Sequence, residues 1–224
     1  MKIVTIFEDN HLIVVIKPQG VPVQKDSSAD PDLQTAVMEL LKNKYNKPGN
    51  VFLGIVHRLD RPVGGAIVFA KTSKAASRLS EQIRQNIWKK QYVAIVDGVP
   101  AGSGGILEDY LIKNSDANMV SVVDSSIKGA KKAVLKYSVI DKNDKQAILS
   151  IDLVTGRSHQ IRVQLASRGW PIMNDHRYNS KAVKGGNIML WSHIIKIKHP
   201  VSGNTMQFKA EVPEIFNDII HSGG

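Results

Sequence analysis

The chain has 224 residues, a formal net charge of +10 at neutral pH and no cysteine. Its length and 42% hydrophobic content suit one large domain or two small ones with enough material for a core. The missing cysteine excludes disulfides, thiolate catalysis and cysteine-ligated metal sites. The basic charge fits either a polyanionic partner or a merely basic surface. No apolar run suits a signal peptide or a membrane span, so we expect a soluble, cytoplasmic protein.

The hydrophobic pattern predicts more strands than helices along the chain. Strands are expected at residues 3–7, 12–17, 66–70, 92–96, 131–140, 147–153, 194–198 and 206–210. Helices are expected at residues 31–45, 72–86 and 156–168. Asp30 followed by Pro31 would cap the first helix, Thr72 or Ser73 the second, and Gly169 would end the third. Glycines and prolines mark residues 97–113 as a connector.

Short turns separate most of the expected strands, which favours hairpin connections. The sequence shows no internal repeat, low-complexity linker or break in composition. We therefore expect an α+β fold, with residues 1–224 forming one domain whose largely antiparallel mixed sheet is flanked by helices and loops.

The first cluster of chemically interesting residues lies directly before the expected strand at 66–70. It contains His57, Arg58 and Asp60, and two glycines follow at Gly64 and Gly65. A cationic neighbour keeps a partly buried carboxylate ionised at neutral pH, which suits a catalytic group. An isolated aspartate in such a loop more often caps a turn.

The second cluster reads Gly156-Arg157-Ser158-His159-Gln160-Ile161-Arg162. On a helix, Arg157 and Arg162 lie about 140° apart around the axis and cannot both point at one spot. His159 would share a face with Arg162. Either one arginine binds a carboxylate or phosphate, or the helix has a basic, solvated face.

The third cluster reads Trp88-Lys89-Lys90-Gln91-Tyr92. Aromatic rings stack on bases and lysines bind phosphates, so this cluster suits RNA contact. The alternative is that Tyr92 is an ordinary half-buried strand residue. The histidines lack metal-ligand spacing, and no phosphate-binding loop or nucleophile elbow occurs, so we expect neither a metal nor another cofactor.

These clusters, in this order, resemble the RluA family of pseudouridine synthases, and the resemblance covers nearly the whole chain. The matching segments are Phe7-Glu8-Asp9 through Lys17-Pro18-Gln19-Gly20, His57-Arg58-Leu59-Asp60, Lys89-Lys90-Gln91-Tyr92, Thr155 to Arg162, and Gly169 to Asp175 with Tyr178. The resemblance implies a pseudouridine-synthase-like domain that isomerises uridines in structured RNA, ribosomal or transfer. It implies base flipping, no cofactor, and RNA as the partner. The S4-type domain of many relatives is not expected here, which favours a monomer.

The resemblance also assigns roles to residues. Asp60 matches the essential aspartate, Arg162 the arginine that pairs with it, and Tyr92 the tyrosine that stacks on the target base. Arg58 matches a residue that fills the space of the flipped nucleotide, and Leu190 an apolar residue against the base. Further RNA contacts are expected from His57, Lys89, Lys90, Arg157 and His159.

The chain departs from the family pattern at three places. Val63-Gly64-Gly65 replaces Thr-Ser-Gly, Asn174 replaces a glycine, and Leu190-Trp191-Ser192 replaces Leu-His-Ala. The first departure is the one feature that favours an alternative, an RNA-binding or rRNA-folding factor of the same fold with weak or lost catalysis. A glycosidase would need a second carboxylate at a fixed separation, for which the sequence offers no candidate.

Overall fold

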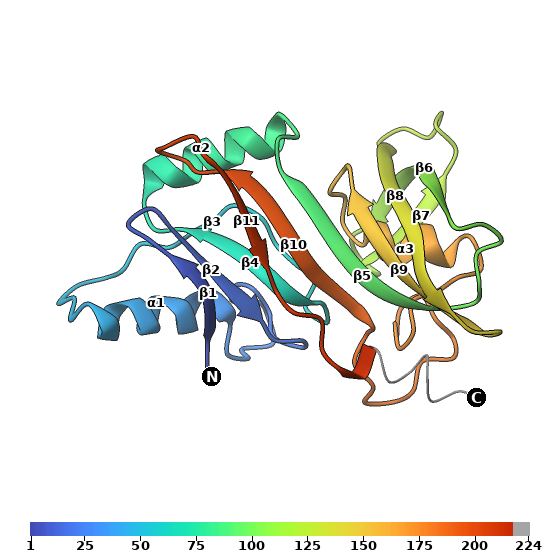
Figure 1. Cartoon of the computed structure of the whole chain (residues 1–224), viewed down its shortest axis with the longest axis horizontal. Helices are drawn as coiled ribbons and strands as arrows, with labels where there is room; N and C mark the ends of the chain where they lie inside the picture. The colour runs from blue at the N-terminus through green and yellow to red at the C-terminus, as the bar shows by residue number, and fades with distance from the viewer. Residues whose placement is uncertain (217–224) are drawn as a thin grey trace. The chain divides into compact units, whose positions relative to one another are not determined.

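The computed structural model of the protein describes residues 1–216, which divide into two compact units (Figure 1). Unit 1 comprises Met1–Lys89 and Ser192–Glu211, and unit 2 comprises Lys90–Trp191 and the described residues from Val212. Both units combine antiparallel strand pairs with helix. The α+β class is therefore confirmed, while the assignment of the whole chain to one domain stays a prediction.

The sheet of unit 1 is built around β4, in which all seven residues are buried. This continuous burial explains its unbroken apolar run, because a central strand is covered on both faces. The strands in spatial order are β1 (Val4–Glu8), β2 (Leu12–Lys17), β4 (Gly64–Ala70) and β10 (Leu190–Lys198, in this unit from Ser192), with β11 (Thr205–Lys209) paired to β10 and β3 (Gly54–Ile55) to β4. Lys17 is paired with Gly65 in the β2–β4 ladder, so the end of β2 lies beside the start of β4.

Gly65 is a position where only glycine fits. Its φ is +116°, and a Cβ added there would lie 2.3 Å from the carbonyl oxygen of Ser192. The hydroxyl of Ser192 donates a hydrogen bond to the carbonyl of Ala66 at 3.0 Å. The start of β4 and the Ser192 backbone are thus in direct contact, which a side chain at Gly65 would prevent.

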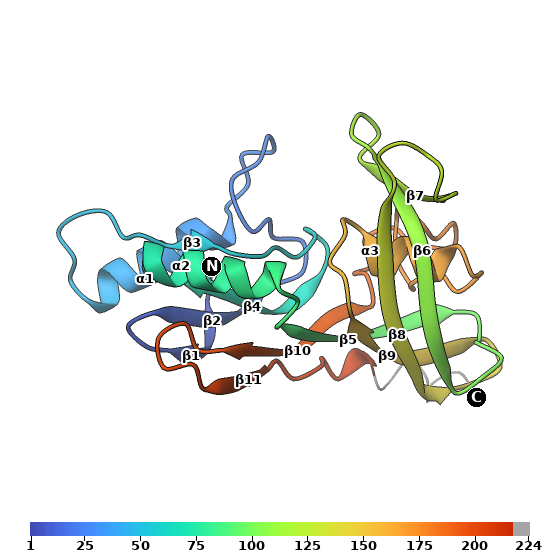
Figure 2. The same cartoon turned by 90° about the horizontal axis from the view of Figure 1, so that it is seen from above.

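Helices α1 (Leu33–Lys44) and α2 (Ser73–Arg84) cover the same face of the unit 1 sheet (Figure 2). The expected cap of α2 is confirmed, because Thr72 accepts a hydrogen bond from the amide of Ala75 at 3.1 Å. The expected cap of α1 at Asp30 is wrong. Asp32 holds that place and accepts from the amide of Thr35 at 2.9 Å, whereas Asp30 is ion-paired with Arg61.

The strands of unit 2 are, in spatial order, β5 (Lys89–Asp97, in this unit from Lys90), β9 (Gln146–Leu153), β8 (Lys131–Lys142), β6 (Gly104–Asn114) and β7 (Met119–Val123). The expected pairing of β8 with β9 is confirmed. The expected connector is wrong over most of its length, because β6 is an eleven-residue strand. Its glycines lie within the ladder, where a Cβ on Gly104 would be 2.6 Å from the carbonyl oxygen of Tyr137. Glycine here permits close approach of two strands and does not mark a loop.

Helix α3 (Gln160–Ala166) is shorter than expected. His159, immediately before it, has a left-handed backbone with φ +50°, and the side chain of Gln160 bonds to Thr155 and to the amide of Arg157. These bonds keep the preceding residues out of the helix, so Arg157 lies in a loop and the helical angle between the two arginines does not apply. The helix ends at Ala166 with Ser167 as its C-cap, so the expected continuation to residue 168 is wrong, although Gly169 has a left-handed backbone with φ +77°.

The two aspartates near α1 give a test of the cap. Asp32→Ala should lower the free energy of unfolding by about 1 kcal/mol, because it leaves an amide of the first turn without its acceptor. Asp30→Ala removes exposed interactions with Arg61 and Ser28 and should have a smaller effect. Urea unfolding of both variants measures the difference. A larger loss for Asp30→Ala would contradict the cap at Asp32.

Candidate functional site

A buried lysine holds the backbone of the loop that carries Asp60. Lys17 is fully buried, and its ammonium donates hydrogen bonds to the carbonyls of Arg61 at 2.8 Å, Val63 at 2.7 Å and Pro18 at 3.0 Å. A turn bond from the amide of Val63 to the carbonyl of Asp60, at 3.0 Å, closes the same loop. The three N–H groups of one side chain thus fix the backbone that carries Asp60.

Lys17 is also electrostatically coupled to Asp60. Burial lowers the pKa of Lys17 to about 7, while the Asp60 carboxylate raises it and Arg61 lowers it further. An ionised carboxylate at position 60 therefore favours the ammonium form that holds the loop.

The neighbours of Asp60 have different surroundings. The Nε2 atom of His57 accepts a hydrogen bond from the amide of Val68 at 2.9 Å, and its ring packs edge-on against Trp88 with centroids 5.0 Å apart. His57 therefore anchors the loop to β4. Trp88 is only 4% exposed, so this ring is a core residue and not a surface for stacking a base. Arg58 is exposed, as a residue that enters a base stack must be.

Arg162 belongs to unit 2 and forms a buried ion pair that the sequence did not indicate. Its Nε and Nη2 atoms donate to the two carboxylate oxygens of Asp175 at 2.8 and 2.7 Å, and the side chains are 4% and 0% exposed. The ring of Tyr178 lies 5.3 Å from the guanidinium carbon. A two-point contact of this kind fixes the plane of the guanidinium as well as its position.

A further chain of hydrogen bonds holds Tyr178. Its hydroxyl accepts from the amide of Val120 at 2.9 Å and lies 2.9 Å from Nδ1 of His159, to which it can donate. His159 is buried. Asn174, next to Asp175, has φ +58°, which agrees with asparagine replacing glycine there. Asp175 and Tyr178 were part of a matching segment, but only the fold shows that they position Arg162.

The other expected site residues of unit 2 divide into buried and exposed ones. Tyr92 is 6% exposed and is paired with Ile151 in the β5–β9 ladder. Leu190 is buried. Arg157 is exposed, and its Nε donates to the carbonyl of Lys132 at 3.0 Å.

Lys90 differs from its exposed neighbour Lys89. Burial lowers the pKa of Lys90, and its ammonium lies close to Gly156, where an added Cβ would be 3.4 Å away. Among the described residues, no hydrogen bond or ion pair reaches this ammonium. A half-buried cation of this kind is ready to bind an anion.

The structure thus places the predicted residues in two groups. His57, Arg58, Asp60 and Lys89 belong to unit 1, and all the others belong to unit 2. Within residues 1–216, no group of three or more histidine, aspartate or glutamate side chains could hold a metal ion, and no helix has the length and apolar character needed to cross a membrane.

The lowered pKa of Lys17 predicts a pH dependence of stability. The unfolded chain keeps this proton up to about pH 10.5, whereas the folded protein releases it above about 7, so unfolding takes up a proton in this window. The contribution of Lys17 to stability should therefore rise with pH between 7 and 10.5, by up to ~1.4 kcal/mol per pH unit. Urea unfolding of wild type and Lys17→Met at several pH values measures this slope as the difference between them. If the free energies of unfolding of the two proteins changed in parallel with pH, the lowered pKa of Lys17 would be contradicted.

Comparison with known proteins identifies the family. A model of the RNA pseudouridylate synthase family matches residues 11–167. Ribosomal large subunit pseudouridine synthase C of Buchnera aphidicola subsp. Baizongia pistaciae is 30% identical over 223 residues, covering 96% of this chain and 69% of that protein. The dual-specificity RNA pseudouridine synthase RluA of Escherichia coli O157:H7 is 33% identical over 214 residues, covering 93% and 92%.

A solved structure agrees on the fold. Human RNA Pseudouridylate Synthase Domain Containing 4 superposes with a TM-score of 0.81 at 22% identity, covering 97% of this chain and 92% of that one. The resemblance seen in the sequence motifs is therefore confirmed by the family match and by the relatives. The chain belongs to the RNA pseudouridylate synthase family and is an RNA pseudouridine synthase of the RluA type.

Proposed function

We propose that the protein isomerises specific uridines in ribosomal or transfer RNA, with Asp60 as the catalytic residue. The main observation behind the proposal is that the loop carrying Asp60 has a fixed backbone. The buried ammonium of Lys17 binds the carbonyls on both sides of Pro62 in this loop. Relatives named for the large ribosomal subunit and for dual RNA specificity support this class of substrate. Such substrates also support a cytoplasmic site of action.

The proposed reaction is an isomerisation of one substrate. It therefore needs no second substrate to donate or accept electrons or a chemical group. The target uridine leaves the base stack, and Arg58 fills the space it vacates. Asp60 acts on the ribose side while the N1–C1′ bond breaks. The uracil then turns, a C5–C1′ bond forms, C5 loses its proton and N1 gains one. Tyr92 stacks on the base and is the candidate for removing the C5 proton.

Arg162 is expected to supply positive charge to the reaction that Asp60 carries out. Its orientation is already set by Asp175, so the guanidinium does not have to be ordered when substrate binds. Lys90 is proposed to bind a phosphate of the bound strand, because its ammonium has no partner among the described residues. Lys89, Arg157 and Arg58 are exposed and are proposed to supply further positive charge for RNA binding. Leu190 is proposed to supply an apolar contact to the base.

Replacing Asp60 tests the proposed chemistry. Asp60→Asn and Asp60→Ala should abolish tritium release from RNA labelled with 5-³H-uridine, because the C5 proton leaves only after the bond rearrangement. RNA affinity should survive in both variants. Asp144→Asn changes an exposed aspartate and serves as the matched control.

The same assay separates the two functions. Full tritium release by Asp60→Ala would contradict the role of Asp60. A wild-type protein that binds RNA but releases no tritium from any cellular RNA would support the alternative, an RNA-binding or rRNA-folding factor of this fold.

Replacing Arg162 tests its proposed role. Arg162→Lys should reduce turnover by about tenfold or more, because lysine lacks the planar fork that meets both oxygens of Asp175. Arg84→Lys, in an exposed ion pair with Glu81, should keep wild-type turnover. The rate of tritium release at saturating RNA measures both, with urea unfolding to confirm that the variants are folded. Wild-type turnover in Arg162→Lys would contradict the role.

A further inference from the structure

A cluster of charges surrounds Glu8, at the end of β1. The carboxylate of Glu8 accepts hydrogen bonds from the ammonium of Lys44 at 2.6 Å, the ammonium of Lys71 at 2.6 Å and the hydroxyl of Tyr45 at 2.7 Å. Burial alone would raise the pKa of Glu8, but these three donors lower it to about 2. Glu8 is therefore ionised at neutral pH and holds Tyr45 by its hydroxyl.

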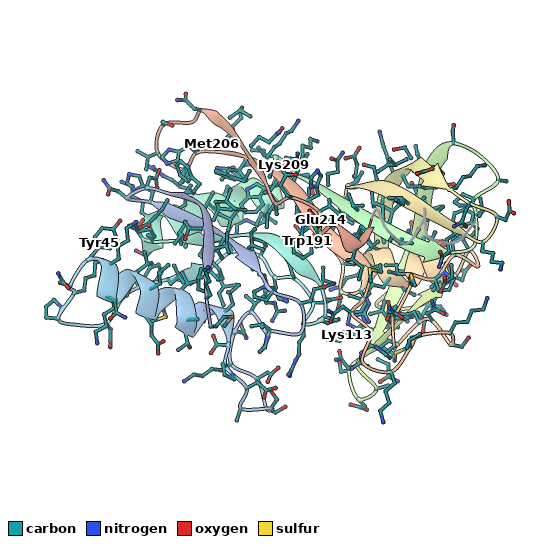
Figure 3. All side chains as sticks on the ribbon, turned by 60° about the horizontal axis from the view of Figure 1, so that its bottom comes forward. Tyr45, Lys113, Trp191, Met206, Lys209 and Glu214 are labelled. Carbon is teal, nitrogen blue, oxygen red and sulfur yellow. The ribbon has the colours of Figure 1, made fainter. Side chains whose placement is uncertain are left out.

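The ring of Tyr45 remains open to solvent. It follows the last residue of α1 and is 48% exposed (Figure 3). Three ammonium groups lie around it, at 5.4 Å for Lys44, 5.9 Å for Lys47 and 5.0 Å for Lys71 from the ring centroid. With the one carboxylate of Glu8 against three lysines, this group keeps a positive charge.

The register of the sheet separates this cluster from the Asp60 loop. In the β2–β4 ladder, Lys17 is paired with Gly65 at the end next to Asp60, and Leu12 with Ala70 at the other end. The five residue steps between these pairs correspond to about 17 Å along the strands. Lys71 follows Ala70 directly, so the cluster lies at the end of β4 opposite the loop.

We propose that Glu8, Lys44, Tyr45, Lys47 and Lys71, named here the Tyr45 cluster, form a second contact site for the RNA substrate. An unpaired base stacks on the Tyr45 ring, and flanking phosphates bind Lys44 and Lys47. An exposed aromatic ring among lysines is the combination that binds single-stranded RNA without sequence preference. Because Glu8 already fixes the ring, little side-chain freedom is lost on binding.

The positions of the lysines favour RNA over a purely structural role. A helix C-terminus explains a lysine at position 44, since cations interact favourably with the helix dipole there. It does not explain why an exposed ring is fixed by its hydroxyl with Lys71, from the end of β4, beside it. The inference rests on the proposed RNA substrate, and it extends the bound strand well beyond the target uridine.

The experiment combines crosslinking with affinity. A single-stranded RNA of about 20 nucleotides containing 4-thiouridine, long enough to span both sites, is irradiated with the Asp60→Asn protein, and crosslinked residues are mapped by mass spectrometry. We expect a crosslink at Tyr45. Tyr45→Ala should weaken binding of the same RNA by about tenfold, whereas Tyr45→Phe, which keeps the ring, should stay within about twofold of the parent.

Two controls identify the cause of any loss. Phe52→Ala removes another aromatic ring that is 50% exposed and should leave the affinity unchanged. Lys47→Ala should reduce the slope of log affinity against log salt by about 0.7, the value for one phosphate contact on a single strand. Tyr45 variants without any change in affinity or crosslinking would overturn the inference.

A kinetic measurement separates this inference from the proposed function. In the Asp60 wild-type background, Tyr45→Ala should raise KM for tritium release about tenfold and leave kcat unchanged. Normal tritium release with an unaffected KM would reject the Tyr45 cluster alone. Absence of tritium release from the wild type, with the Tyr45 crosslink present, would reject the proposed catalysis alone.

Discussion

The unit 1 site depends on one buried ammonium. An isolated lysine charge in a protein core is strongly unfavourable, and Lys17 is tolerated because three carbonyl groups replace its hydration. Two of these carbonyls flank Pro62 in the loop that carries Asp60. The hydrogen bonds that offset part of the cost of burial therefore also fix the loop, and the negative charge of Asp60 stabilises the ammonium in return.

In unit 2, a buried ion pair between two side chains holds a charged residue in place. Arg162 is held by two bonds to Asp175 and by the ring of Tyr178, which is fixed in turn by Val120 and His159. A buried pair of this kind contributes little net stability, but it sets the orientation of a guanidinium before any substrate is present. In both units, the residue proposed to act on RNA is held by a neighbour that carries the opposite charge or accepts its hydrogen bonds.

The sequence predicted what local patterns determine. Continuous or alternating apolar residues located the buried strands of both sheets, and the motifs located the Asp60 loop. The helix cap at Asp32, the strand through Gly104 and the Arg162–Asp175 pair were missed, because each depends on a partner distant in the chain or on competition between two similar residues. Lys17 was recognised only as part of a motif, since nothing local shows that its side chain turns inward to three carbonyls.

The contact between Gly65 and Ser192 has a consequence for biosynthesis. These residues lie more than 120 positions apart, yet the strand that leaves the Asp60 loop is packed directly on the Ser192 backbone. A nascent chain that has emerged only as far as Lys90 contains Asp60 but lacks β10, the strand that lies next to β4 in the sheet. The loop thus gains its full support late in synthesis, when most of the chain is present to fold around it.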